Sequence, residues 1–248
     1  MRVVYILWLR QIKRYFRSRS RIIGTLGQPL LYMLALGFGL GPVFARAGNG
    51  NYFHFLVPGV IAQSVLFTSI FAGIEVIWDK QFGFLKETLV APVSRFEIMI
   101  GRTLGGATVA TIQGLIVLAI AYLLGFRADN IFLLPIACVF MLLTAVLLTS
   151  LGTAVASVIE DMQGFQLIMN FMVLPLFFLS GSLFPLNGVP TVLRVIASID
   201  PLTYGVDGLR GVLTSNSQIN LGLDAAVLVF ITVILVGIGS YLFSKIQI

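Results

Sequence analysis

The stretch IFLLPIACVFMLLTAVLLTSLGTAVASV, residues Ile131–Val158, runs from end to end without a charged side chain. An α-helix rises about 1.5 Å per residue, so about 20 apolar residues cross the roughly 30 Å hydrocarbon core of a bilayer. Lipid offers no partner to backbone polar groups, and only helices or closed barrels satisfy them internally. A barrel needs alternating segments of about ten residues, which this chain lacks. The stretch therefore predicts an all-α membrane protein.

The overall composition supports the same fold class. Of the 248 residues, 58% are hydrophobic and only 10% are charged, and the mean hydropathy is +1.01. Soluble domains are typically about 45–50% apolar and about 25% charged. The only cysteine is Cys138, so the chain has no intrachain disulfide. These values exclude a disordered regulator, a secreted disulfide scaffold and an ordinary cytosolic enzyme.

Charged residues divide the rest of the sequence into further apolar segments of spanning length. The six predicted spans are Ile22–Phe44, Phe55–Trp78, Thr103–Phe126, Ile131–Val158, Phe165–Phe184 and Leu221–Phe243. No long linker and no segment of soluble-domain size separates them. We therefore expect one membrane domain over residues 1–248.

Lysine and arginine residues flank these spans unevenly, and cytoplasmic flanks carry the excess of such residues. Twelve fall on the side of the N-terminus, namely Arg2, Arg10, Lys13, Arg14, Arg17, Arg19, Arg21, Lys80, Lys86, Arg95, Arg102 and Lys245. Four fall on the other side, namely Arg46, Arg127, Arg194 and Arg210. The bias predicts a multi-pass protein of the cytoplasmic (inner) membrane with both termini in the cytoplasm. The net charge of +6 is thus mainly a topology signal, with membrane lipid and not nucleic acid as the expected partner.

Residues 1–21 are predicted to form an amphipathic interface helix. At helical spacing, apolar and aromatic side chains gather on one arc and cations on the opposite arc. The apolar arc holds Tyr5, Trp8, Leu9, Ile12, Tyr15 and Phe16, and the basic arc holds Arg10, Lys13, Arg14, Arg17 and Arg21. We expect the rings to face acyl chains and the cations to face anionic head groups.

The loop over residues 79–102 is the longest on the predicted cytoplasmic side. Its middle mixes apolar and charged residues up to Pro92, which disfavours helix at the preceding residue. A new helix is expected near Ser94, because Glu97 follows at capping-box spacing. From the pattern alone, two readings of the exposed apolar residues stay open: the loop folds back on the bilayer, or it docks into another protein.

The segment 185–220 lies outside the membrane by the same topology. Asp200 and Pro201 are a predicted N-cap and first helical residue, and Asp207 and Arg210 stand at the spacing of a helical ion pair. Its apolar residues predict short helices that dip into the outer leaflet or pack on the bundle.

Three features together resemble an ABC-2-type exporter permease, most closely the daunorubicin-resistance and nodulation-factor exporter permeases. They are the amphipathic N-terminal helix, GFLKETLVAPVSRFEIMIGR at residues 83–102 and FFLSGSLFPLNGVPTVLRVIASIDPLTYGVDGLRGVL at residues 177–213. The resemblance covers nearly the whole chain in order. It implies two permease chains, here expected to be a homodimer, working with two separate ABC-type ATP-binding subunits. It also implies export of an amphipathic substrate, such as a drug, a lipid or a lipid-linked glycan.

The resemblance further implies roles for particular residues. The loop would be a coupling helix that fits a groove on the ATP-binding subunit, through Phe84, Leu85, Lys86, Glu87, Leu89 and Pro92. The segment 185–220 would form short re-entrant helices that close the external end of the path, through Pro185, Pro190, Asp200, Pro201, Tyr204, Asp207 and Arg210.

Signals for catalysis are missing from the sequence. A P-loop needs a lysine after glycine, and none of Lys13, Lys80, Lys86 and Lys245 follows one. The single histidine, His54, excludes H-E-x-x-H and leaves no histidine cluster for a metal site. We therefore expect no catalytic residues, metal or cofactor.

Uncharged polar residues within the spans have two open readings, as lining of a transport path or as helix–helix hydrogen bonds. The candidates for the path are Gln63, Gln113 and Asn170. The alternative function is a self-sufficient secondary transporter or channel, which typically uses titratable groups near mid-membrane. Glu75, near the inner boundary, is the candidate group considered within the predicted spans.

Overall fold

The computed structural model describes residues 2–46, 50–83 and 93–245, and all its regular elements are helices. The all-α prediction is therefore confirmed. In chain order the elements are α1 (Arg2–Arg17), α2 (Arg19–Leu31), the π-helix η1 (Tyr32–Phe38), α3 (Gly41–Arg46), α4 (Tyr52–Phe71), α5 (Ile74–Gln81), α7 (Arg95–Leu123), the 3-10 turn η2 (Ile131–Leu133), α8 (Leu134–Val158), α9 (Met162–Leu179), α10 (Thr191–Ile199), α11 (Pro201–Thr214) and α12 (Leu221–Ser244).

Five helical segments are long and apolar enough to cross a membrane, and a sixth is reached if a bent pair is one span. The five are Tyr52–Gln81, Arg95–Leu123, Ile131–Val158, Met162–Leu179 and Leu221–Ser244. The bent pair joins Arg2–Arg17 to Ile22–Phe38 at 73°. The uncharged stretch Ile131–Val158 is thus a helical segment of spanning length with the predicted bounds. The span predicted to start at Thr103 starts earlier, at Arg95.

The first predicted span, Ile22–Phe44, differs most from the structure. Pro29 lies inside α2, and the π-helix η1 follows it directly. Proline removes a backbone donor and crowds the preceding turn, which favours such an irregular turn. The continuous segment ends at Phe38, and Gly41–Pro42 begins the separate short helix α3.

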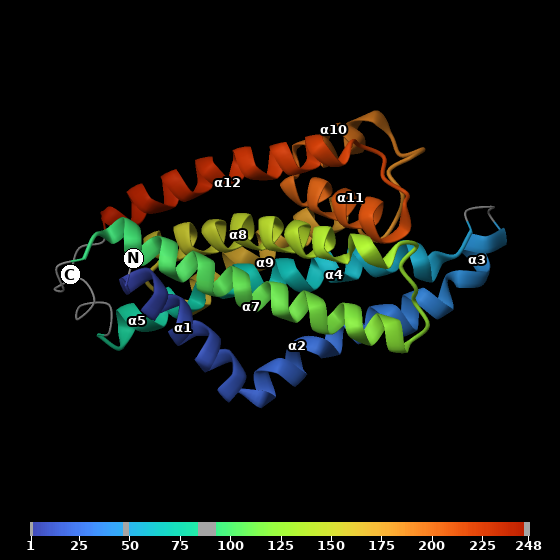
Figure 1. Ribbon diagram of the computed structural model, residues 1–248. Coiled ribbons are helices and arrows are strands. Elements are labelled where there is room, and N and C mark those ends of the chain that lie inside the picture. Colours follow the sequence, from blue (N-terminus) through green and yellow to red (C-terminus); the bar gives the residue numbers. More distant parts are fainter. Residues whose placement is uncertain (1, 47–49, 84–92, 246–248) are drawn as a thin grey trace.

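The helix α8 lies in the middle of the bundle and packs against α4, α7, α11 and α12 (Figure 1). The backbone of α8 touches the backbone at the break between α4 and α5. A Cβ atom added at Gly73 would lie 2.4 Å from the carbonyl oxygen of Gly152, closer than any real contact allows. Glycine at both positions therefore lets the two segments touch along their main chains.

The N-terminal helix α1 packs along α7 and does not lie apart from the bundle. Added Cβ atoms at Gly101 and Gly105 would lie 3.0 Å or less from side-chain atoms of Leu7 and Gln11. Trp8 Nε1 donates to Thr108 Oγ1 at 3.0 Å, and the Tyr15 hydroxyl donates to Gln113 Oε1. Two rings expected to face acyl chains therefore face α7, whereas Tyr5 and Phe16 remain exposed.

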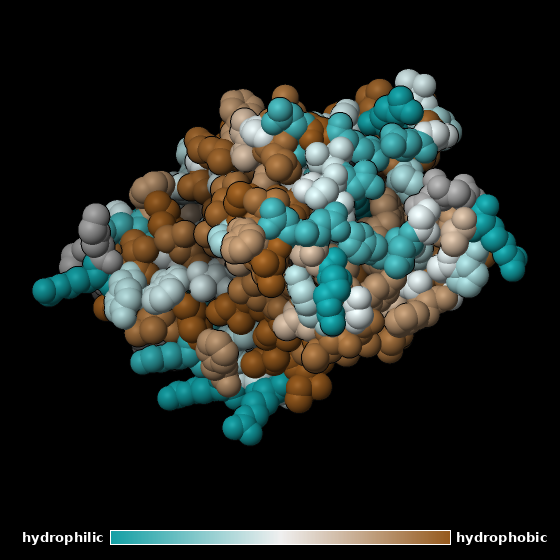
Figure 2. Space-filling model, turned by 45° about the vertical axis from the view of Figure 1, so that its right-hand side comes forward, coloured by the Kyte–Doolittle hydropathy of each residue, from teal (hydrophilic) through white to brown (hydrophobic). Residues whose placement is uncertain are grey.

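The bundle has two distinct ends (Figure 1). One holds the start of α1, the end of α12, the end of α5 and the start of α7, and we call it the α5–α7 end. The other holds α3, α10 and α11, and we call it the α10–α11 end. Figure 2 shows apolar surface over much of the middle, with long hydrophilic side chains projecting from the lower part, where Figure 1 places α1 and α2.

Candidate functional site

The predicted coupling residues Phe84, Leu85, Lys86, Glu87, Leu89 and Pro92 lie outside the described residues. The structure describes the two helices that lead into and out of them. Helix α5 ends at Gln81, and α7 begins at Arg95 with Ser94 as its N-cap. Ser94 Oγ accepts a hydrogen bond from the backbone N–H of Glu97 at 3.1 Å, so the helix start predicted there is confirmed.

Three helices meet at one carboxylate beside this loop. Asp79 of α5 accepts from Arg10 of α1 at 3.1 Å with one oxygen and from Arg102 of α7 with the other. The Arg102 side chain is 4% exposed, and a buried guanidinium needs such a partner because charge is costly away from water. Asp79 therefore fixes α1 to both helices that flank the predicted coupling loop.

A second contact joins α1 to α5 on the more exposed side. The Arg14 guanidinium lies 3.8 Å from a carboxylate oxygen of Glu75 and 5.2 Å from the ring centre of Trp78. Glu75, a charged residue within the second predicted span, therefore faces Arg14 of α1. This position favours a role at the α5–α7 end over a role in mid-membrane.

Lys80 and Asp161, also at the α5–α7 end, form hydrogen bonds with backbone groups at the ends of helices. The Lys80 ammonium donates to the carbonyl oxygens of Ala156, Ser157 and Ile159, at 2.6–3.3 Å, where α8 ends. Asp161 accepts from the backbone N–H of Gly164 as the N-cap of α9. These contacts link α5 to the connection between α8 and α9.

At the other end, α10 and α11 form a compact pair around Asp200. One oxygen of Asp200 accepts from the backbone N–H of Leu202 at 2.8 Å, with Pro201 at the first helical position, so the predicted N-cap is confirmed. The other oxygen is buried and has no hydrogen-bond partner in the described part of the chain. Burial of the carboxylate raises its pKa to about 7.

Asp207 and Arg210 on α11 do not form the ion pair that their spacing suggested. Asp207 accepts from the backbone N–H groups of Gln218 and Ile219 at 2.8–3.1 Å. Arg210 donates to the carbonyl oxygen of Gly181 at 3.0 Å, and its guanidinium lies 4.0 Å from the centre of the Phe55 ring. No salt bridge joins the two residues in the described structure, because each side chain is already directed elsewhere.

The two side chains instead join α11 to three other segments. Asp207 holds the connection to α12, while Arg210 holds the turn after α9 and the face of a ring on α4. Burial lowers the pKa of Arg210 to about 10, so it keeps its charge at neutral pH.

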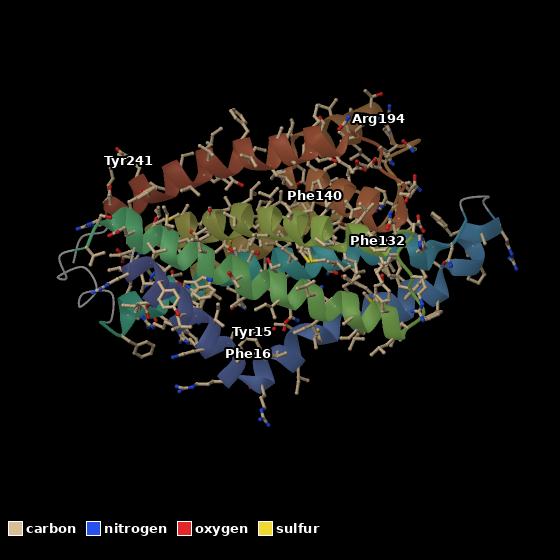
Figure 3. The ribbon with its side chains drawn as sticks, viewed as in Figure 1. Tyr15, Phe16, Phe132, Phe140, Arg194 and Tyr241 are labelled. Atoms are coloured by element: carbon tan, nitrogen blue, oxygen red, sulfur yellow. The ribbon has the colours of Figure 1, made fainter. Side chains whose placement is uncertain are left out.

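The remaining predicted gate residues lie around this core. Tyr204 donates its hydroxyl to the carbonyl oxygen of Ser198 at 2.8 Å, which ties α11 back to α10. Pro190 is the N-cap of α10, and Pro185 lies in the turn before it. The structure therefore brings Asp200, Pro201 and Tyr204 together at the junction of the two helices. The exposed Arg194 on α10 marks the rim of this end in Figure 3.

The three candidates for a path lie in different surroundings. Gln113 is buried on α7 and accepts from Tyr15 of α1, which fits helix packing. Asn170 is exposed on α9. Gln63 on α4 is 1% exposed, and neither atom of its amide has a hydrogen-bond partner in the described part of the chain.

Gln63 lies in a cavity of about 300 Å³ between α2 and α4. The cavity is uncharged, with polar groups beside aromatic ones. Its lining consists of Gly24, Thr25, Gln28, Pro29, Gln63, Ser64, Phe67, Thr68 and Phe71. Buried amides without partners are rare in folded proteins, so the Gln63 amide is available to a hydrogen-bonding guest in this cavity.

Sequence reasoning missed Asp79 and Arg102 as partners. Each lay just outside a predicted span, Asp79 after the second and Arg102 before the third, and was assigned to a solvated flank. The signal that points to them is the opposite charge at facing ends of two consecutive spans, which an antiparallel helix pair brings together.

Known proteins are similar in sequence to this chain over most of its length. The family model described as ABC-2 type transporter matches residues 2–214. Nodulation protein J of Rhizobium leguminosarum bv. trifolii is 26% identical over 221 residues, which cover 88% of this chain and 80% of that protein. Nodulation protein J of Rhizobium leguminosarum bv. viciae is 27% identical over 227 residues, covering 90% and 86%. "Putative transport permease ycf38" of Cyanophora paradoxa is 26% identical over 255 residues, covering 95% and 87%.

Proposed function

Because this chain belongs to the ABC-2 type transporter family and is a multi-pass membrane transport permease, we propose that it is the permease subunit of an ATP-driven exporter. The family implies association with an ABC ATP-binding subunit. ATP hydrolysis would take place on that separate subunit, since the chain has no P-loop lysine. The match of the family model over residues 2–214 is the observation that carries the proposal.

The loop between α5 and α7 would receive the mechanical input. Residues 79–102 form the coupling loop in this proposal, with Phe84, Leu85, Lys86, Glu87, Leu89 and Pro92 in contact with the ATP-binding subunit. The bonds from Asp79 to Arg10 and Arg102 support it, because they join both flanks of the loop to α1. A displacement of the loop would then move α1, α5 and α7 together.

The orientation proposed for the chain follows from the location of its cations. Helix α1 begins and helix α12 ends at the α5–α7 end in Figure 1, and the predicted topology assigns twelve of the sixteen lysine and arginine residues to that side of the membrane. We infer an inner-membrane location with the α5–α7 end in the cytoplasm. The α10–α11 pair, within residues 185–220, would then be the external gate.

A second copy of the chain would complete the path. Polar side chains are exposed on α2 and α9, including Gln28, Gln166 and Asn170, and Tyr32 of η1 stacks on Phe177 of α9 at 6.0 Å. On α12, by contrast, no exposed side chain between Leu223 and Ile238 is polar. Exposed amides are costly against lipid, so a homodimer that covers the α2–α9 face is favoured.

The substrate would pass between the two copies, beside Gln63 and Asn170, whereas Gln113, also predicted for the path, holds α1 to α7. The cavity at Gln63 combines unpartnered amide atoms with the rings of Phe67 and Phe71. This mixture suits an amphipathic molecule, such as a drug, a lipid or a lipid-linked glycan, with an uncharged polar part. The whole chain, residues 1–248, acts as one transmembrane domain in this proposal.

The coupling part of the proposal is tested by co-purification with the proposed ATP-binding subunit. The double variant Leu85→Asp and Leu89→Asp should abolish capture of that subunit while the permease still inserts, because two carboxylates would have to enter an apolar contact. The matched control is Val192→Asp and Ile199→Asp on α10, two exposed apolar residues at the opposite end. Equal capture by both variants would contradict the proposal.

A further inference from the structure

A cavity of about 780 Å³ lies between α1 and the end of α5. One wall is the basic arc of α1 and the other is the last turn of α5. Its lining consists of Ile6, Leu9, Arg10, Lys13, Arg14, Arg17, Trp78, Asp79 and Phe82. The cavity is thus amphipathic: α1 contributes the cations together with Ile6 and Leu9, and the end of α5 contributes Trp78, Asp79 and Phe82.

The cavity is strongly positive. Four cations and one carboxylate line it, an excess of three positive charges. The carboxylate of Asp79 is shared with the buried Arg102 of α7, and Arg14 lies 3.8 Å from Glu75, so carboxylates offset Arg10 and Arg14 only in part. Lys13 and Arg17 form no salt bridge within the part of the chain that the structure describes.

The spacing of these cations makes an anion favourable here. Each of residues 10, 13, 14 and 17 has another of the set three or four positions away, which places them side by side on one face of α1. Like charges at such steps repel one another and destabilise a helix. An anion in the cavity would contact several of them at once and remove this repulsion.

The apolar wall decides which anion fits. Ile6 is 61% exposed and Phe82 is 75% exposed, and both border the same cavity as the cations. Trp78 is also in the lining, and tryptophan favours the depth of lipid head groups. A soluble phosphate would leave these groups exposed to water, whereas a phospholipid brings a phosphate and an acyl chain together.

We propose that the cavity between α1 and α5 binds one anionic phospholipid of the cytoplasmic leaflet. The phosphate lies among Arg10, Lys13, Arg14 and Arg17, and the first part of the acyl chains lies on Ile6, Phe82 and Trp78. The placement in the cytoplasmic leaflet rests on the orientation in the proposed function. The lipid then belongs to the junction that holds α1 against the flanks of the coupling loop.

The site is tested with the purified full-length chain in detergent, without an ATP-binding subunit. Added dioleoyl-phosphatidylglycerol should raise the thermal unfolding midpoint more than dioleoyl-phosphatidylcholine does, and Lys13→Gln with Arg17→Gln should remove that difference. The double variant should fold, because it relieves repulsion on α1. The control, Arg2→Gln with Arg19→Gln, removes two exposed cations outside the cavity and should keep the full lipid effect.

A local measurement separates this site from general attraction to acidic lipid. In a Trp8→Phe background Trp78 is the only tryptophan, and phosphatidylglycerol brominated near the glycerol should quench its fluorescence more than brominated phosphatidylcholine. Lys13→Gln with Arg17→Gln should abolish the excess quenching. Neither the unfolding midpoint nor the fluorescence quenching depends on transport. These results therefore remain interpretable if the proposed export function is wrong.

Three results would overturn the proposal. The first is an equal phosphatidylglycerol effect in the cavity variant and the wild type. The second is reproduction of the stabilisation by inorganic phosphate with phosphatidylcholine, which would assign the cavity to a soluble anion. The third is loss of capture of the ATP-binding subunit in the cavity variant with an unchanged lipid effect, which would assign it to the protein partner.

Discussion

Asp79 stabilises the α5–α7 end, because it neutralises the buried guanidinium of Arg102. Asp79→Asn should destabilise the protein by about 3–5 kcal/mol, since it leaves Arg102 buried without a counter-charge. The change in the free energy of unfolding is measured by denaturant titration, followed by tryptophan fluorescence. Coupling to the ATP-binding subunit should also be less efficient, because Arg10 of α1 loses its charged partner on α5.

The nearby Glu75→Gln variant is the control for this prediction. It removes the same charge from the same helix, but its pair with Arg14 is 3.8 Å long, with side chains 36% and 13% exposed, against 4% and 8% for Arg102 and Asp79. A longer and more exposed pair contributes less than a buried one, so the loss of stability should be smaller. A loss as large in Glu75→Gln as in Asp79→Asn would show that net charge at this end, and not the buried pair, sets the stability.

Asp200 gives the α10–α11 end a dependence on pH. Its pKa in the folded protein is about 7, raised by burial from 3.8, so the folded state holds a proton that the unfolded state releases. This contribution to stability is complete below about pH 4 and declines as the pH rises to about 7. The unfolding midpoint of the wild type should therefore decrease over this range more steeply than that of Asp200→Asn.

Asparagine is a suitable replacement for this test because it is an equally good N-cap and does not ionise. The bond to the backbone N–H of Leu202 is preserved in the variant. Parallel pH profiles for the two proteins would mean that Asp200 titrates near its ordinary pKa.

At the scale of elements, the close approach of α1 to α7 depends on glycine. A Cβ atom at Gly101 would lie 3.0 Å from Leu7 Cβ and 3.2 Å from Val4 Cα, and backbone atoms give way only if α1 moves. Gly101→Ala should therefore destabilise the protein and raise the rate of amide hydrogen exchange in residues 2–17. The increase should be confined to α1 and the facing turns of α7.

Gly237→Ala provides the matched control, because Gly237 is also inside a long helix but an added Cβ meets nothing within 4 Å. Alanine is favoured over glycine in a helix by about 0.8–1 kcal/mol, so this variant should be neutral or more stable. Exchange in α1 that is unchanged in Gly101→Ala would indicate that α1 does not rest on that glycine.

These elements differ in how far the sequence alone could predict them. The span Ile131–Val158 was predictable at both ends, because the absence of charge marks it and Asn130 and Ile159 flank it. The N-cap at Ser94 and the Asp200–Pro201 start were equally predictable, since capping depends on residues a few positions apart. The side of α1 that packs on α7 was not predictable, because an amphipathic pattern specifies an apolar face without specifying whether lipid or protein covers it.

The same limit applies to the sites. The residues of the α10–α11 pair were predicted, but the partners of Asp207 and Arg210 were not, because a spacing of three residues permits an ion pair without excluding backbone partners from distant turns. Arg102 and Asp79 were separated by the predicted loop, and only folding brings them together. Pairings across the bundle are therefore what the structure adds to the sequence.

At the scale of the whole molecule, two lipid-facing surfaces of different chemistry compete to be the contact between copies. The exposed side chains of α12 between Leu223 and Ile238 are apolar, whereas α9 exposes Gln166 and Asn170 among Leu167 and Phe171. Figure 3 shows α12 along the upper edge, with Tyr241 pointing outward near its end. Lipid satisfies the α12 surface, but the amides of α9 need a polar partner.

We therefore expect two copies to meet through α9 and not through α12. In a Cys138→Ser background, Asn170→Cys should be cross-linked into a covalent dimer in membranes by a flexible bis-maleimide reagent. Ile234→Cys, exposed on α12, should remain monomeric under the same treatment, since its surroundings are acyl chains. The measurement is the fraction of dimer on a denaturing gel, and cross-linking of Ile234→Cys alone would place the contact between copies on α12, with the α9 amides facing lipid.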